Sequence, residues 1–215
     1  VTSQGHQLYG QRHLDSAEAP RVVLLHGEGA DLDSLRWLRE ALTAQQISVD
    51  EWDLPGHGLS DGDYDAECRD AILAICTIAD PSRTAGVSYV AVGRTCSHLL
   101  ETHVAEPVSL TLLHPAAPPA DAYRRSAWSR TPTVCLVDPT DRAADAAARE
   151  LSRRIRAWYL RTFVHDDDTG RWQLHASSMT VRLVLEQHWL RQQRRGRGGP
   201  TTQDAGDGPP TAGHA

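Results

Sequence analysis

Short apolar segments alternate with longer amphipathic ones from Arg21 to about residue 192, and this alternation is the strongest constraint on the fold. Apolar residues that do not strictly alternate with polar ones are typical of strands covered on both faces, as in a parallel sheet. We expect a weaker segment, His6–Arg12, to form an antiparallel edge strand. The predicted buried strands are Val22–Leu25, Ile47–Trp52, Val87–Val92, Val108–Leu113 and Thr133–Val137.

Helices are predicted between these strands, because apolar residues recur there at spacings of three and four. We expect Asp31 or Asp33 to cap the first helix, Asp80-Pro81 to end the second, and Ser177 or Ser178 to begin the last. Strands alternating with helices predict an α/β fold, with a mostly parallel sheet between two layers of helices. The apolar positions are Leu32, Leu35, Leu38 and Leu42, then Ile72, Ile75, Cys76 and Ala79, and finally Val181, Val184, Leu185, His188 and Trp189.

The last part of the chain differs in composition from the rest. Residues 193–215 contain no large apolar side chain, so little burial could offset the entropy lost on ordering them. We therefore predict one domain over residues 1–192 and a disordered tail over 193–215.

The charge balance limits the expected partners. The chain of 215 residues has 22 basic and 28 acidic side chains, a net charge of −6, which disfavours nucleic acid and anionic membranes. No apolar stretch approaches the roughly 20 residues of a membrane-spanning helix, and no secretory signal is visible. We expect a cytoplasmic protein. The four cysteines lack metal-site spacing, and the segment around His165 and Asp166–Asp168 reads as a solvated turn, so no metal or other cofactor is predicted.

Two loops that follow predicted strands carry distinctive residues. His26-Gly27-Glu28-Gly29 follows the first strand, where exposed backbone N–H groups could form either an oxyanion hole or only a tight turn. Asp53–Ser60, with the sequence DLPGHGLS, follows the second strand. This pair of loops is similar to the α/β-hydrolase family, and the resemblance extends from about residue 7 to residue 192.

The family resemblance implies a nucleophile elbow, which places the central residue of G-x-S-x-G at a sharp turn between strand and helix. The corresponding segment here is Gly93-Arg94-Thr95-Cys96-Ser97, so Thr95 replaces the usual serine. The elbow requires positive φ, which is strained for a β-branched residue. Cys96 is a less suitable nucleophile, because shifting the motif by one residue puts Arg94 and His98 where small residues are needed.

The resemblance also implies the remaining site residues. Asp141, or else Asp138, takes the position of the acid, and His175 that of the base, with room for one helix and one strand between Asp141 and His175. The implied oxyanion donors are the backbone N–H groups of Glu28 and Cys96. The predicted substrate-binding residues are His26, Gly27, Arg124 and Arg125.

Three functions follow from these residues. The first is hydrolysis or acyl transfer of an ester or thioester by a Thr95–His175–Asp141 triad. The second is ligand or partner binding by a catalytically silent member of the fold. The third is cofactor-free general-base catalysis by His175 and Asp141, with Thr95 only donating a hydrogen bond. The segment from His114 to Thr131 is too short for a cap domain, so the site is expected to be open to a small-molecule or carrier-tethered acyl substrate.

Overall fold

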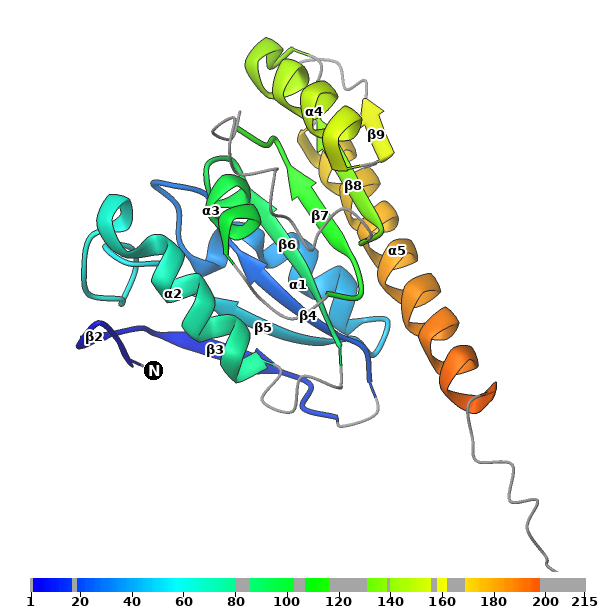
Figure 1. Cartoon of the computed structure of the whole chain (residues 1–215), viewed down its shortest axis with the longest axis horizontal. Helices are drawn as coiled ribbons and strands as arrows, with labels where there is room; N and C mark the ends of the chain where they lie inside the picture. Colours follow the sequence, from blue (N-terminus) through cyan, green and yellow to red (C-terminus); the bar gives the residue numbers. More distant parts are fainter. Residues whose placement is uncertain are drawn as a thin grey trace, which may run out of the picture.

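A seven-stranded sheet forms the centre of the protein (Figure 1). The computed structural model describes residues 2–16, 19–79, 86–102, 107–116, 131–138, 140–155, 158–161 and 169–197, and within them the sheet has the order β3-β5-β4-β6-β7-β8-β9. Only β3 pairs with its neighbour in the antiparallel direction. The strands are β3 (Gly10–His13), β4 (Arg21–Leu25), β5 (Ser48–Trp52), β6 (Val87–Val92), β7 (Leu110–Leu113), β8 (Thr133–Val137) and β9 (Trp158–Arg161).

The predicted strands are confirmed to within two residues at each end. The expected edge strand is divided, because its first residues form β2 (His6–Gln7), which pairs with β1 (Thr2–Ser3) in a separate two-stranded sheet. The rest becomes β3, which is antiparallel as expected. β7 ends at Leu113 and β8 begins at Thr133, which leaves no room for a cap domain between them.

Helices cover both faces of the sheet (Figure 1), and the buried residues divide accordingly. Val23 and Leu25 of β4 pack with α2, α3 and α4 on one face, whereas Val22 and Leu24 pack with α1 and α5 on the other. Burial on both faces explains why these strands do not alternate polar and apolar residues. The helices are the 3-10 turn η1 (Leu32–Leu35), α1 (Arg36–Thr43), α2 (Tyr64–Ala79), α3 (Thr95–Glu101), α4 (Arg142–Ile155) and α5 (Thr169–Arg197).

The last helix is longer than the sequence predicts. It begins at Thr169, not at Ser177 or Ser178, and continues to Arg197. The hydroxyls of both serines donate to carbonyl groups four residues earlier, a bond that satisfies serine inside a helix, so neither serine caps its start. Residues 198–215 of the predicted tail, like Asp80-Pro81 after α2, lie outside the described residues.

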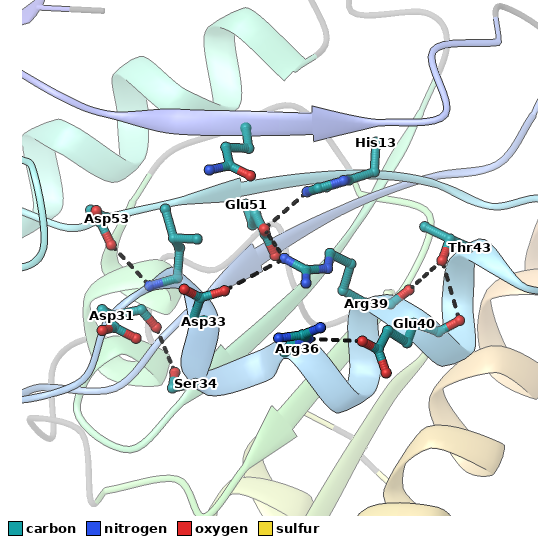
Figure 2. A network of polar contacts seen from close by, with 12 residues as sticks. His13, Asp31, Asp33, Ser34, Arg36, Arg39, Glu40, Thr43, Glu51 and Asp53 are labelled. Atoms are coloured by element: carbon teal, nitrogen blue, oxygen red, sulfur yellow. Dashed lines mark hydrogen bonds and ion pairs between the residues drawn. The ribbon is translucent and has the colours of Figure 1, made fainter.

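A buried aspartate joins the two loops that the sequence singled out. Asp31 occupies the N-cap position of η1 but its side chain makes no capping bond, contrary to the prediction. Instead the Leu32 N–H donates to Asp53 Oδ1 over 2.9 Å (Figure 2), and the Leu59 N–H donates to Asp53 Oδ2 over 2.9 Å. Asp53 is 2% exposed. One carboxylate from the end of β5 therefore fixes both the start of η1 and the following loop.

A second polar cluster attaches α1 to the sheet. The carboxylate of Glu51, on β5, is 1% exposed and accepts hydrogen bonds from Arg39 of α1 and from His13 of β3 (Figure 2). A buried carboxylate needs such partners, because the loss of hydration is otherwise uncompensated. The cluster fixes the register of α1 against the edge of the sheet.

We predict that Asp53→Asn lowers the free energy of unfolding by about 1–3 kcal/mol, because an amide has only one oxygen for two buried N–H donors. The Asp31→Asn variant is the matched control and should change stability by less than about 0.5 kcal/mol, since its side chain makes no cap bond. Urea unfolding followed by circular dichroism measures both variants. Equal effects in the two variants would contradict the role of Asp53.

Candidate functional site

The loops after β4, β6, β7 and β8 meet at one edge of the sheet. Because these strands are parallel and adjacent, their carboxyl ends lie side by side, which is where ligands bind in open α/β sheets. Glu28, Gly93, His114 and Asp141 each follow one of these strands. This edge is the candidate site.

The sharp turn after β6 is centred on Gly93, not on Thr95. Gly93 has φ of +59°, whereas Arg94 is already in the right-handed helical region and Thr95 begins α3. The motif in the structure is therefore Ala91-Val92-Gly93-Arg94-Thr95, two residues earlier than predicted. Apart from the adjacent chain, no described residue would lie within 4 Å of a Cβ atom placed on Gly93. The turn at which the family places its nucleophile thus holds glycine, and no described side chain fills the space beside it.

Thr95 instead occupies the position where the elbow motif requires a small, close-packed residue. Its side chain is fully buried, and its hydroxyl donates to the His26 carbonyl over 2.7 Å. The Tyr64 hydroxyl lies 2.8 Å from the same oxygen and must be the donor to it, because the threonine proton is already used. Cys96 is also buried, and burial raises the pKa of its thiol well above the usual value. Neither side chain is exposed to a substrate.

Two backbone N–H groups in the loops after β4 and β6 have no acceptor among the described residues. They belong to Glu28, in the loop after β4, and Arg94, directly after Gly93. The predicted donor Cys96 is unsuitable, because its N–H is directed at the Gly93 carbonyl. Moving the elbow by two residues makes Arg94 the residue after the nucleophile position, which is where the family places its second oxyanion donor.

Two histidines hold the Glu28 loop in place. His26, predicted to bind substrate, is 1% exposed, and its Nε2 accepts the Leu54 N–H over 2.9 Å while Nδ1 lies 2.7 Å from the Gly27 carbonyl. His57 Nε2 accepts the Gly29 N–H over 2.8 Å. Burial lowers the pKa of His26, which keeps the ring neutral and able to accept. His26 and Gly27 therefore hold the Glu28 loop in place rather than contact a substrate. His57 has the same supporting role, which the sequence did not predict.

Arg94 connects the elbow to the surrounding loops. Its guanidinium pairs with Glu28 over 2.8 Å and with Asp65, at the start of α2, over 2.7 Å. It also lies 5.7 Å from the centre of the Tyr64 ring. These ion pairs are exposed and contribute little stability, but they fix the Glu28 loop against Arg94. The two carboxylates of Glu28 and Asp65 outnumber the single guanidinium of Arg94, so these three residues, which form the rim of the site, carry a net negative charge.

No hydrogen bond or ion pair joins Asp141 and His175, the acid and the base of the predicted triad. Asp141 Oδ1 accepts the Ala144 N–H at the start of α4, and Oδ2 lies 4.0 Å from Nδ1 of His114. Asp138 accepts from Thr140. His175 is exposed on α5, six residues after Thr169, the first residue of that helix. The structure does not show the Thr95–His175–Asp141 triad.

His114, which was not among the predicted site residues, lies at ion-pair distance from Asp141, with 4.0 Å between its Nδ1 and Asp141 Oδ2. It follows β7 directly and has φ of +46°, a left-handed conformation that is uncommon for any residue other than glycine. Its ring lies 4.7 Å from that of Trp172 of α5. Its place at a strand end was the signal that could have identified it. Arg124, Arg125 and His165 lie outside the described residues.

No helix in the described ranges is both long and apolar enough to cross a membrane. Neither a protein-family model nor a curated protein matches the chain.

Several solved structures share its architecture. The structure of Est1E from Butyrivibrio proteoclasticus with bound ferulic acid is similar, with a TM-score of 0.69 and 13% sequence identity, and the match covers 86% of this chain and 98% of that one. The enol-lactonase of Burkholderia xenovorans has a TM-score of 0.67 and 15% sequence identity, and the match covers 86% of this chain and 99% of that one. The monoacylglycerol lipase of Paleococcus ferrophilus has a TM-score of 0.66 and 15% sequence identity, and the match covers 84% of this chain and 99% of that one. With its mostly parallel sheet and its elbow after β6, this chain has the α/β-hydrolase fold.

Proposed function

We propose that this protein binds the carbonyl oxygen of an acyl compound at the N–H groups of Glu28 and Arg94, and forms no covalent acyl intermediate. The observation that carries the proposal is glycine at the turn where the family places its nucleophile. Covalent catalysis needs a nucleophilic side chain next to the bound carbonyl, and glycine has none.

The two N–H groups support binding at this point. Neither has an acceptor among the described residues, and an unpaired backbone donor readily receives a ligand oxygen. The ion pair between Arg94 and Glu28, together with the His57 bond to Gly29, holds both donors before a ligand arrives. Such preorganisation reduces the entropy lost on binding.

The charge of the rim favours a neutral ligand oxygen. Glu28 and Asp65 already use the Arg94 guanidinium, so a second anion would meet two carboxylates and only one cation. We therefore propose a neutral carbonyl, as in an ester, thioester, amide or ketone. The small-molecule or carrier-tethered acyl ligand that the sequence predicts is retained in this proposal.

Hydrolysis of an ester or thioester through Thr95 is the competing function. It requires the Thr95 hydroxyl to leave two hydrogen bonds and a fully buried position before it can reach a substrate. Breaking these bonds leaves buried polar groups of His26 and Tyr64 unsatisfied, at about 1–3 kcal/mol each. The geometry therefore favours the non-covalent function.

A fluorophosphonate probe, which modifies activated serine hydroxyls, distinguishes the two functions. We predict that the wild type and Thr95→Ser are not modified, because residue 95 is buried, whereas Gly93→Ser is modified at the installed residue, where there is open space. Intact-mass spectrometry measures the adduct, and thermal unfolding checks that each variant folds. Modification of Thr95→Ser, or wild-type ester turnover that Thr95→Ala abolishes, would establish the competing function instead.

The binding site itself is tested with benzamide, a neutral carbonyl compound, and with benzyl alcohol as the matched ligand without a carbonyl. We predict that benzamide shifts the backbone amide NMR signals of Glu28 and Arg94 more than those of other described residues. Benzyl alcohol should leave both signals near their starting positions. Shifts confined to other parts of the protein would contradict the proposed site.

A further inference from the structure

The loop after β7 lies directly against the elbow. The Gly93 N–H donates to the Leu113 carbonyl over 3.0 Å, and the Ala116 N–H donates to the Gly93 carbonyl over 3.1 Å. The segment from Leu113 to Ala116 is therefore bonded to both the N–H and the carbonyl group of Gly93. His114 belongs to this short segment, so its backbone is fixed next to the open position.

The His114 ring is held by two neighbours from other elements. Nδ1 lies 4.0 Å from Asp141 Oδ2, which is an ion-pair distance rather than a hydrogen bond, and the ring packs at 4.7 Å against Trp172. The Trp172 ring in turn packs edge-on against Trp37 of α1, at 5.7 Å between centroids. Nε2 makes no hydrogen bond within the described residues. The ring is therefore positioned by packing on Trp172 with Asp141 on its Nδ1 side, and its Nε2 has no partner among the described residues.

The charges around His114 suit a base. Burial lowers its pKa, while Asp141 and Asp138, the two carboxylates near the ring, act in the opposite direction. The net direction is downward, so the imidazole is neutral at pH 7 and can accept a proton. The carboxylate of Asp141 can then stabilise the imidazolium that forms, as the aspartate of a His–Asp pair does.

We infer that His114 is the proton acceptor of this site, taking a proton from an acidic C–H group next to the carbonyl held by Glu28 and Arg94. This inference rests on the proposed function, since it uses the same two N–H donors. Nε2 accepts the proton, the C–H electron pair forms a carbon–carbon double bond, and the carbonyl π electrons move to oxygen. The resulting enolate oxygen carries the negative charge at the two N–H groups, and the imidazolium then returns the proton to the carbon or to the enolate oxygen, which restores the neutral base.

The substrate class follows from this chemistry. It is a ketone, ester or thioester with an acidic C–H beside the carbonyl. Neither a nucleophilic side chain nor a redox cofactor enters the step. The glycine that prevents acyl-enzyme formation is compatible with this reaction, because the open position at Gly93 can hold part of the substrate.

The test uses 5-nitrobenzisoxazole, a carbon acid whose ring opens in one step when a base removes its only acidic proton. The base takes that C–H proton, the electron pair forms a nitrile, the N–O bond breaks, and a coloured phenolate leaves. The wild-type protein is measured directly, so no installed residue is required. The variants are His114→Gln, Asp141→Asn and His175→Gln, with His6→Gln as the surface control.

We predict that the wild type opens the ring and that His114→Gln lowers kcat/KM by about 100-fold, the usual contribution of a general base. His6→Gln should retain the wild-type rate. The rate should fall as pH decreases through the lowered pKa of His114, since protonation removes the base. Asp141→Asn removes a group that raises this pKa, so the fall should move to still lower pH, a shift that a purely structural role would not produce.

Absence of turnover above the His114→Gln level, or loss of turnover in His175→Gln instead, would overturn the inference. Thermal unfolding of each variant separates loss of the base from loss of the fold. The benzisoxazole assay tests the base alone, whereas the fluorophosphonate and benzamide experiments test the proposed function. A protein that binds benzamide without opening the benzisoxazole would keep the proposed binding function and lose only the base.

Discussion

The left-handed turn at the end of β6 is the constraint on which the site depends. A chain that leaves a buried parallel strand and enters a packed helix within two residues must reverse sharply, and here a residue with φ of +59° makes that reversal. Glycine adopts this conformation without steric cost, whereas a β-branched residue does not. With glycine at the turn, the backbone geometry of a nucleophile elbow is preserved while the chemistry of the nucleophile is absent.

The layers and strands could be predicted because burial imposes a pattern that is visible in the residues. Val22–Leu25 is apolar throughout, and Val87–Val92 is apolar except for the buried Ser88, because helices cover both sheet faces. Helix starts were less predictable. Asp31 looked like a cap, but its role is filled by Asp53, 21 residues away from Leu32 in the chain. Capping by a distant residue leaves no local signal in the sequence.

The site was predicted only in part, for a similar reason. The loops of Glu28 and Asp141 follow strands whose ends are clear in the sequence, so their place at the carboxyl ends of β4 and β8 could be predicted. Gly93-Arg94-Thr95 and Ala91-Val92-Gly93 each read as an elbow motif, since small residues occur at both spacings, and only the backbone φ distinguishes them. His175 was favoured because the last helix was expected to begin after it, whereas α5 begins at Thr169 and includes it.

The geometry of a parallel sheet explains how a base could move from one loop to another. Neighbouring strands lie about 4.8 Å apart, so the residues that follow adjacent strands lie within side-chain reach of each other. β7 lies between β6 and β8 in the sheet. A histidine that follows β7 can therefore place its imidazole between the end of β6 and a carboxylate that follows β8. His114 follows that strand, β7, and meets Asp141 from that side. A change of base in this way leaves the sheet, the elbow and the two N–H donors where they are.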